Sequence, residues 1–168
     1  ANNVILTGLN GTWNLGGGAF SGATGSSFQA GAGTGILNYS GTIATGTGRS
    51  VDIQSKNGGS VNLSGAINDT DLGINLTNNT GATINFTGGI SASTGTSPAF
   101  TATGGGTINV TQNNTTIVNT LTTTTATALV VQNTTIGVSN IEFRSISSTG
   151  GTSNGITLDG TGASGGLR

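Results

Sequence analysis

A triplet of an apolar, a polar and an apolar residue recurs six times in this chain at nearly constant spacing. Five copies have Asn at the centre, at positions 24, 24, 23 and 24 residues apart, and the sixth follows after 33 residues. The triplets are Trp13-Asn14-Leu15, Leu37-Asn38-Tyr39, Val61-Asn62-Leu63, Ile84-Asn85-Phe86, Ile108-Asn109-Val110 and Ile141-Glu142-Phe143. A period near 24 built from short strands is typical of a solenoid, in which each repeat is one turn stacked on the last.

Two further apolar series accompany the triplets. Before each triplet, two apolar residues flank a single residue: Val4/Leu6, Phe28/Ala30, Val51/Ile53, Ile74/Leu76, Phe100/Ala102, Leu129/Val131 and Ile156/Leu158. After the triplet comes one more apolar residue, at Ile43, Ile67, Ile90 and Ile146, with Phe20 as a candidate in the first turn. Each turn therefore offers two or three strands of about three residues, separated by Gly, Ser, Thr and Asn.

Alternation along a strand sends the outer residues of a triplet to one face and the central residue to the other. We expect the first residues of the triplets, from Trp13 to Ile141, to form one interior column, and the third residues a second column. Successive turns would then give parallel strands joined by right-handed crossovers. We predict an all-β fold, a right-handed parallel β-helix of six to seven turns of about 23–29 residues, with residues 1–168 as one domain. The six-residue period of left-handed helices and the nonapeptide of calcium-dependent β-rolls are absent.

Composition excludes several classes of protein. Only 5% of the residues are charged and the net charge is −1, with four Lys and Arg residues in total. Four cations cannot form a basic stripe, so we expect no nucleic-acid partner. We also expect no membrane insertion, because no apolar stretch reaches the length of a transmembrane helix. The absence of Cys excludes disulfides and thiol catalysis.

The last two turns carry a family resemblance. The segments Leu129–Ser147 (LVVQNTTIGVSNIEFRSIS) and Asn154–Leu167 (NGITLDGTGASGGL) resemble a repeat of very large bacterial surface and secreted proteins. These are β-strand-repeat or right-handed β-helix proteins of the adhesin and autotransporter-passenger type, and residues 1–128 share only their general pattern. Arg168 stands where that family tends to have Thr-Val-type residues, and is either a departure or a cut end. The resemblance implies an extracellular bacterial protein with a structural or adhesive role and no catalytic residue.

Asp69 and Asp71 form the only acidic cluster. Two such carboxylates can bind Ca²⁺ or act as the acid and base of a glycoside hydrolase. Aligning the turns places Thr45 and Ala92 beside Asp69, with no second carboxylate or base on either side. We therefore favour a solvated turn between coils, and leave Ca²⁺ binding and catalysis as alternatives.

Other repeated residues have structural explanations as well. We expect the outward Asn side chains to form a hydrogen-bonded ladder rather than a ligand-binding stripe. The run Thr122–Thr125 is expected in a projecting loop, and ice binding is disfavoured because no matching array of Thr pairs is visible. The aromatic residues are expected in the core. Gly16–Gly18 is a turn rather than a phosphate loop, because no Lys and helix follow it.

The sequence thus predicts a structural rod that is not an enzyme, and has no catalytic, metal or cofactor site. We expect it outside the cell, in a surface adhesin, a secreted matrix protein or a filament. Because neither end shows a polar cap, the chain is expected to be part of a longer array or to stack end to end with copies of itself. The alternatives are a polysaccharide-active β-helix enzyme and a module that binds surface glycans or Ca²⁺.

Overall fold

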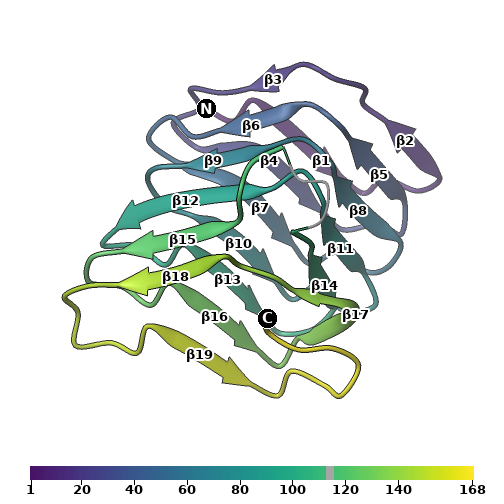
Figure 1. Cartoon of the computed structure of the whole chain (residues 1–168). Coiled ribbons are helices and arrows are strands. Elements are labelled where there is room, and N and C mark those ends of the chain that lie inside the picture. Colours follow the sequence, from purple (N-terminus) through teal and green to yellow (C-terminus); the bar gives the residue numbers. More distant parts are fainter. Residues whose placement is uncertain (113–115) are drawn as a thin grey trace.

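The computed structural model describes residues 1–112 and 116–168, which form β-strands and turns without a helix. The strands lie in three parallel sheets (Figure 1). Sheet A contains β1 (Val4–Thr7), β4 (Ser26–Gly31), β7 (Arg49–Gln54), β10 (Ile74–Thr77), β13 (Phe100–Thr103), β16 (Leu129–Gln132) and β19 (Ile156–Asp159). Sheet B contains β2 (Thr12–Asn14), β5 (Ile36–Tyr39), β8 (Ser60–Leu63), β11 (Thr83–Phe86), β14 (Thr107–Val110) and β17 (Thr135–Ile141). Sheet C contains β3 (Ala19–Phe20), β6 (Thr42–Ala44), β9 (Ile67–Asp69), β12 (Ile90–Gly95), β15 (Thr120–Thr123) and β18 (Ser145–Ser148).

The chain visits the sheets in the order A, B, C through six turns before it enters β19. Each interior strand is paired in parallel with its counterparts one turn earlier and one turn later, so the strands stack along one axis (Figure 1). A single bridge between Ile141 and Leu167 follows β19. The predicted parallel β-solenoid is therefore confirmed.

Sheet A contains every apolar pair that the sequence predicted, and in the predicted register. Val4 pairs with Phe28, Phe28 with Val51, and Phe100 with Leu129. In the interior turns these side chains are completely buried, with Phe28, Val51 and Leu129 all 0% exposed. Parallel register brings like positions together, and the apolar alternation fixes which face is buried.

Sheet B confirms the two predicted columns over its central strands. Leu37, Val61, Ile84 and Ile108 are in register and buried, as are Tyr39, Leu63, Phe86 and Val110. The prediction is wrong at Trp13, whose side chain is 44% exposed although it pairs with Leu37. Trp13 lies in the first turn, where β5 is the only strand beside β2, and its indole Nε1 donates to Asn10 O at 2.9 Å.

The sixth triplet is also placed differently from the prediction. Ile136, not Ile141, pairs with Ile108, and Ile141 pairs with Val110. The extra residues between them form an irregularity in β17, and Asn140 in it has a left-handed φ of 66°. Gly137 lies beside Asn109, whose amide occupies the place of a Cβ at that position. Inserted residues have thus shifted the last triplet by one column while keeping its apolar residues in the core.

Sheet C shows a second shift of register. Phe20, Ile43, Ile67 and Ile90 form one column, as predicted. Ile146 instead lies in the neighbouring column, in register with Leu121. The position next to Ile90 in the following turn is taken by Asn119, which is buried. Thr122 and Thr123 belong to β15, so the expectation that the Thr run forms a projecting loop is wrong for these two residues. Leu121 beside them supplies a core side chain that the sequence analysis overlooked.

A left-handed residue bends the chain after every strand of sheet A. These residues are Gly8, Ala32, Ser55, Asn78, Gly104, Asn133 and Gly160, with φ between 44° and 78°. Only Gly adopts this conformation without cost, and Asn tolerates it better than most residues. The corner from sheet B to sheet C uses Gly for a different reason. At Gly41, Gly65 and Gly88 a Cβ would collide with a backbone carbonyl of the preceding turn.

Aromatic side chains other than Trp13 fill the interior, as expected. Phe20 and Phe28 both stack on Tyr39, with ring centroids 4.7 and 5.9 Å apart. Phe100 contacts Phe86 and Phe143 edge to face, at 5.6 and 6.1 Å. Because these contacts join different sheets and turns, they tie the three sides of the solenoid together.

Candidate functional site

The outer face of sheet A carries polar side chains that bond to one another. Gln54 Nε2 donates to both carboxylate oxygens of Asp52, at 2.8 and 2.9 Å. Asn75 Nδ2 donates to Asp52 Oδ1 at 2.8 Å, and Thr77 Oγ1 donates to Asn75 Oδ1 at 3.0 Å. Asp52 is only 8% exposed as a result. The carboxylate of Asp52 is therefore occupied by protein donors.

The outer face of sheet B carries the predicted Asn ladder. Each amide Nδ2 donates to the Oδ1 of the preceding rung at 2.7–2.8 Å, through Asn14, Asn38, Asn62, Asn85 and Asn109. The ladder ends at β17, where Asn109 Oδ1 accepts from Ser139 N. A hollow of about 230 Å³ lies beside the first three rungs, but the amides that line it already bond to each other.

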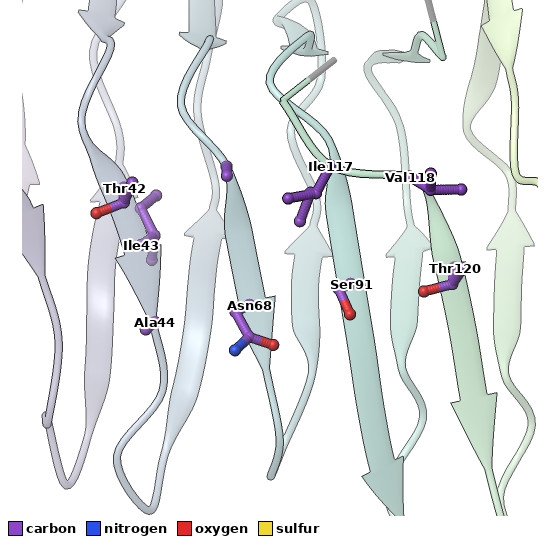
Figure 2. A pocket seen from close by; sticks show the side chains of 9 residues that line it. Thr42, Ile43, Ala44, Asn68, Ser91, Ile117, Val118 and Thr120 are labelled. Carbon is purple, nitrogen blue, oxygen red and sulfur yellow. The ribbon is translucent and has the colours of Figure 1, made fainter.

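The outer face of sheet C is hollowed into a larger groove of about 530 Å³ (Figure 2). Four neighbouring strands and the segment that precedes β15 surround it. Its lining residues are Thr42, Ile43, Ala44, Ala66, Asn68, Ser91, Ile117, Val118 and Thr120. In Figure 2, Ile117 projects from that segment over the space between β9 and β12. We call this the sheet C groove.

The wall of the groove comes from the turn that the sequence shows to be longer. Where earlier turns pass from sheet B to sheet C through a short Gly corner, residues 111–119 separate β14 from β15. Thr116 N and Oγ1 both donate to Gly88 O at 3.0 Å, which places the chain against the corner of the preceding turn. Gly89 makes this approach feasible, because a Cβ there would collide with Ile117 O.

Asn119 fixes the base of this wall. In the earlier turns the N–H groups of Ile43 and Ile67 donate to backbone carbonyls of the next turn, both at 3.0 Å. The N–H of Ile90 instead donates to the side-chain oxygen of Asn119 at 2.7 Å. Asn119 Nδ2 then donates to Thr111 O at 2.9 Å and Glu142 O at 2.8 Å. The buried side-chain amide of Asn119 thus makes the hydrogen bonds that a backbone peptide group makes in the earlier turns. The backbone of the inserted residues is therefore not needed to continue the stack at this point.

Asp69 and Asp71 are not equivalent. Asp69 is 0% exposed and pairs with Ala92, as the alignment predicted. Its Oδ2 accepts from Ser50 N at 2.9 Å, and its Oδ1 accepts from the backbone N–H groups of Asp71 and Gly73, both at 3.0 Å. Asp69 therefore caps the corner from sheet C to sheet A from the inside, and the turn is not simply solvated. Asp71 is half-buried.

One cation is buried in the corner between sheets A and B. Lys56 is 1% exposed, and its Nζ donates to Gly35 O at 2.7 Å and Gly33 O at 3.4 Å. Burial lowers the pKa of Lys56 from its ordinary 10.5, because the charged form loses hydration there. Burial likewise raises the pKa of Tyr39 above 10.0, although a backbone hydrogen bond with Phe20 opposes the shift. Both groups lie inside the stack and outside the residues that line the groove.

No group of three or more His, Cys, Asp or Glu side chains that would suit a metal ion occurs among residues 1–112 and 116–168. Within the same ranges, no helix is long and apolar enough to cross a membrane.

The sheet C groove was missed in the sequence analysis. The signal available was the 33-residue gap before the last triplet, together with exposed apolar residues such as Val118 inside it. That gap indicated a longer turn, but not the direction in which the extra residues fold.

Comparison of the chain with protein-family models, curated proteins and solved structures gives no match. The β-solenoid architecture thus rests on the sequence pattern and the structure, and the adhesin or autotransporter type stays a prediction from resemblance.

Proposed function

We propose that this chain is a structural section of a β-solenoid rod in an extracellular bacterial protein, a surface adhesin, a secreted matrix protein or a filament. The observation that carries the proposal is the continuous parallel strand pairing of all three sheets over six turns, which persists through the irregularities in β12 and β17. Every interior strand is hydrogen-bonded on both edges, so load along the chain is shared between turns. The resemblance of residues 129–167 to bacterial surface repeats supports the extracellular location.

The proposal includes contact between the end turns and other copies of the chain. Apolar side chains that are buried in interior turns are half-exposed at both ends, with Trp13 at 44% and Ile156 and Leu158 both at 42%. Exposed strand edges with apolar columns favour the addition of further strands. End-to-end stacking would bury both surfaces without altering the sides of the rod.

Immunogold labelling of intact cells that produce the protein tests the location and shape together. We expect antibodies against this chain to label the outside of intact cells, at a constant distance along surface fibres. Labelling only after the cells are permeabilised would contradict the proposal.

The rival function, cleavage of a polysaccharide, is tested with the purified chain. We expect no release of reducing sugar from a panel of polysaccharides, because the buried Asp69 is held by three backbone N–H groups. Release that is lost in the Asp71→Asn variant would establish the enzyme instead.

A further inference from the structure

The polar side chains in the sheet C groove differ from the Asn ladder of sheet B and the Asp52 cluster of sheet A. Thr42, Asn68, Ser91 and Thr120 come from four adjacent strands, and none of these side chains hydrogen-bonds to another described residue. Asn68 and Thr42 are exposed, and Ser91 and Thr120 are half-buried. On sheets A and B, by contrast, amide and carboxylate groups bond to each other. The groove therefore offers a row of free neutral donors and acceptors.

The groove contains no ionisable side chain. Its lining consists of hydroxyls, one amide and aliphatic groups. Such a surface gives no electrostatic advantage to a phosphate, a carboxylate or a cation. A ligand that matches it is uncharged and combines apolar surface with hydroxyl groups of its own.

The shape of the groove points to a chain-like ligand. It extends across β6, β9, β12 and β15, a distance of about 14 Å at the usual strand spacing. Its volume of about 530 Å³ lies in the range of small-molecule sites. The lining is mainly aliphatic, with Ile117 and Val118 in the wall and Ile43, Ala44 and Ala66 beside the hydroxyl and amide groups of the floor. Sugar rings present both hydroxyl edges and apolar C–H faces, and therefore match both sides.

A peptide strand fits this place less well. Peptides that add to a sheet need an unpaired strand edge, and β9 and β12 in the floor are hydrogen-bonded on both edges. A nucleic acid would meet no cation among the lining residues.

We propose that the sheet C groove binds a segment of an uncharged polysaccharide chain, which lies along the rod axis between the β-sheet and the wall at Ile117 and Val118. The hydroxyl and amide groups of Thr42, Asn68, Ser91 and Thr120 hydrogen-bond to the sugar hydroxyls. This binding activity goes beyond the proposed structural role. Its failure would leave the proposal of a structural rod intact.

Titration with neutral hexasaccharides of glucose, mannose, galactose, xylose and N-acetylglucosamine tests the proposal, with hexagalacturonate as the charged comparator. We expect at least one neutral hexasaccharide to saturate the purified chain in isothermal titration calorimetry. In nuclear magnetic resonance spectra, the shifted amides should belong to β6, β9, β12 and β15.

Two matched pairs of variants connect the binding to the groove. Val118→Asp places a charge in the wall, and Val138→Asp places one on β17, where Val138 is 80% exposed and outside the groove. Asn68→Ala removes the amide from the floor, and Asn57→Ala removes an exposed amide elsewhere. We expect each groove variant to weaken binding about ten-fold, while each control leaves it unchanged. For Asn68→Ala the reason is the loss of one well-placed hydrogen bond, and for Val118→Asp it is the loss of apolar contact beside a new charge.

Four results would overturn the proposal. The first is that none of the five neutral hexasaccharides saturates the protein at about 10 mM, because a dissociation constant above that concentration is too weak for a specific site. The second is equal binding by the groove variants and their controls, and the third is tighter binding of hexagalacturonate. Self-association that Val118→Asp abolishes would assign the groove to a second copy of the chain and would also reject the glycan.

Discussion

Residues 26–110 and residues 116–144 enclose one continuous core by different means. In the first region the rungs of the Asn ladder are 23 or 24 residues apart, and Gly forms the corners between sheets B and C. In the second region the spacing lengthens, and a buried amide at Asn119 bonds to Ile90 across 29 residues. The regular region shows what the repeat requires, and the inserted region shows how far it can be varied without breaking the stack.

The difference also separates two kinds of surface. On the outer faces of sheets A and B, the side chains of the Asp52 cluster and of the Asn ladder bond to their neighbours. Residues 116–118, just before β15, lie against Gly88 and Gly89 and form a wall on sheet C. A binding surface can thus be added to a solenoid by a local insertion, while the columns below it continue.

The largest effect is expected from a charge in a regular column. Ile84→Asp buries an unpaired carboxylate at a site that is 1% exposed, and should lower the free energy of unfolding by more than about 4 kcal/mol. Circular dichroism and urea denaturation measure the loss. Thr83→Asp, one residue earlier on the outer face, is the matched control and should change stability little. Retention of the wild-type midpoint by Ile84→Asp would show that the inward assignment is wrong.

The base of the inserted region should be nearly as sensitive. Asn119→Ala leaves the Ile90 N–H and the carbonyls of Thr111 and Glu142 without this partner in the interior. We expect a loss of about 3 kcal/mol in urea denaturation, since unsatisfied buried groups are costly. A loss below that of Asn62→Ala, described below, would mean that Asn119 does not hold the insertion.

The buried cation should make stability depend on pH. Because the pKa of Lys56 is lowered in the fold, the unfolded chain binds more protons between that value and 10.5. Stability should therefore rise as the pH increases through this window. The thermal midpoint of Lys56→Met should lack this rise when both proteins are followed from pH 7 up to just below 10.0, where the Tyr39 hydroxyl stays protonated. Parallel curves for the two proteins would contradict the burial of the charge.

The smallest effect is expected in the Asn ladder. Asn62→Ala removes two rungs of a half-buried ladder and should cost about 1 kcal/mol, because water replaces part of each bond. Asn57→Ala, an exposed amide outside the ladder, is the control for urea denaturation. If Asn62→Ala lowered the free energy of unfolding as much as Asn119→Ala does, the outer ladder would stabilise the fold as strongly as the interior amide, and this prediction would be wrong.

The sequence allowed the architecture to be predicted because the apolar alternation repeats with a nearly fixed period. Each column from Phe28 to Leu129 in sheet A followed from that pattern alone. The prediction was wrong where the period changes, since Ile141 and Ile146 moved to neighbouring columns. An apolar residue fits either inward column, so hydrophobicity does not determine the register once residues are inserted.

The groove was beyond the reach of the same reasoning. From the sequence, Asn119 is expected to be a loop residue. Only the structure shows that it is buried and bonds to Ile90, Thr111 and Glu142. Thr42, Asn68, Ser91 and Thr120 are unremarkable outward residues until the wall over them is known. Sites that depend on long-range contact between an insertion and a sheet carry no local motif.

The measurement that tests the central claim most directly is cryo-electron microscopy of the native protein, isolated with antibodies against this chain. A rod built from these turns should have uniform width and a layer line at about 4.8 Å along its axis, the spacing of its parallel strands. Compact particles without an axial repeat would contradict the account of this chain as a section of a solenoid rod.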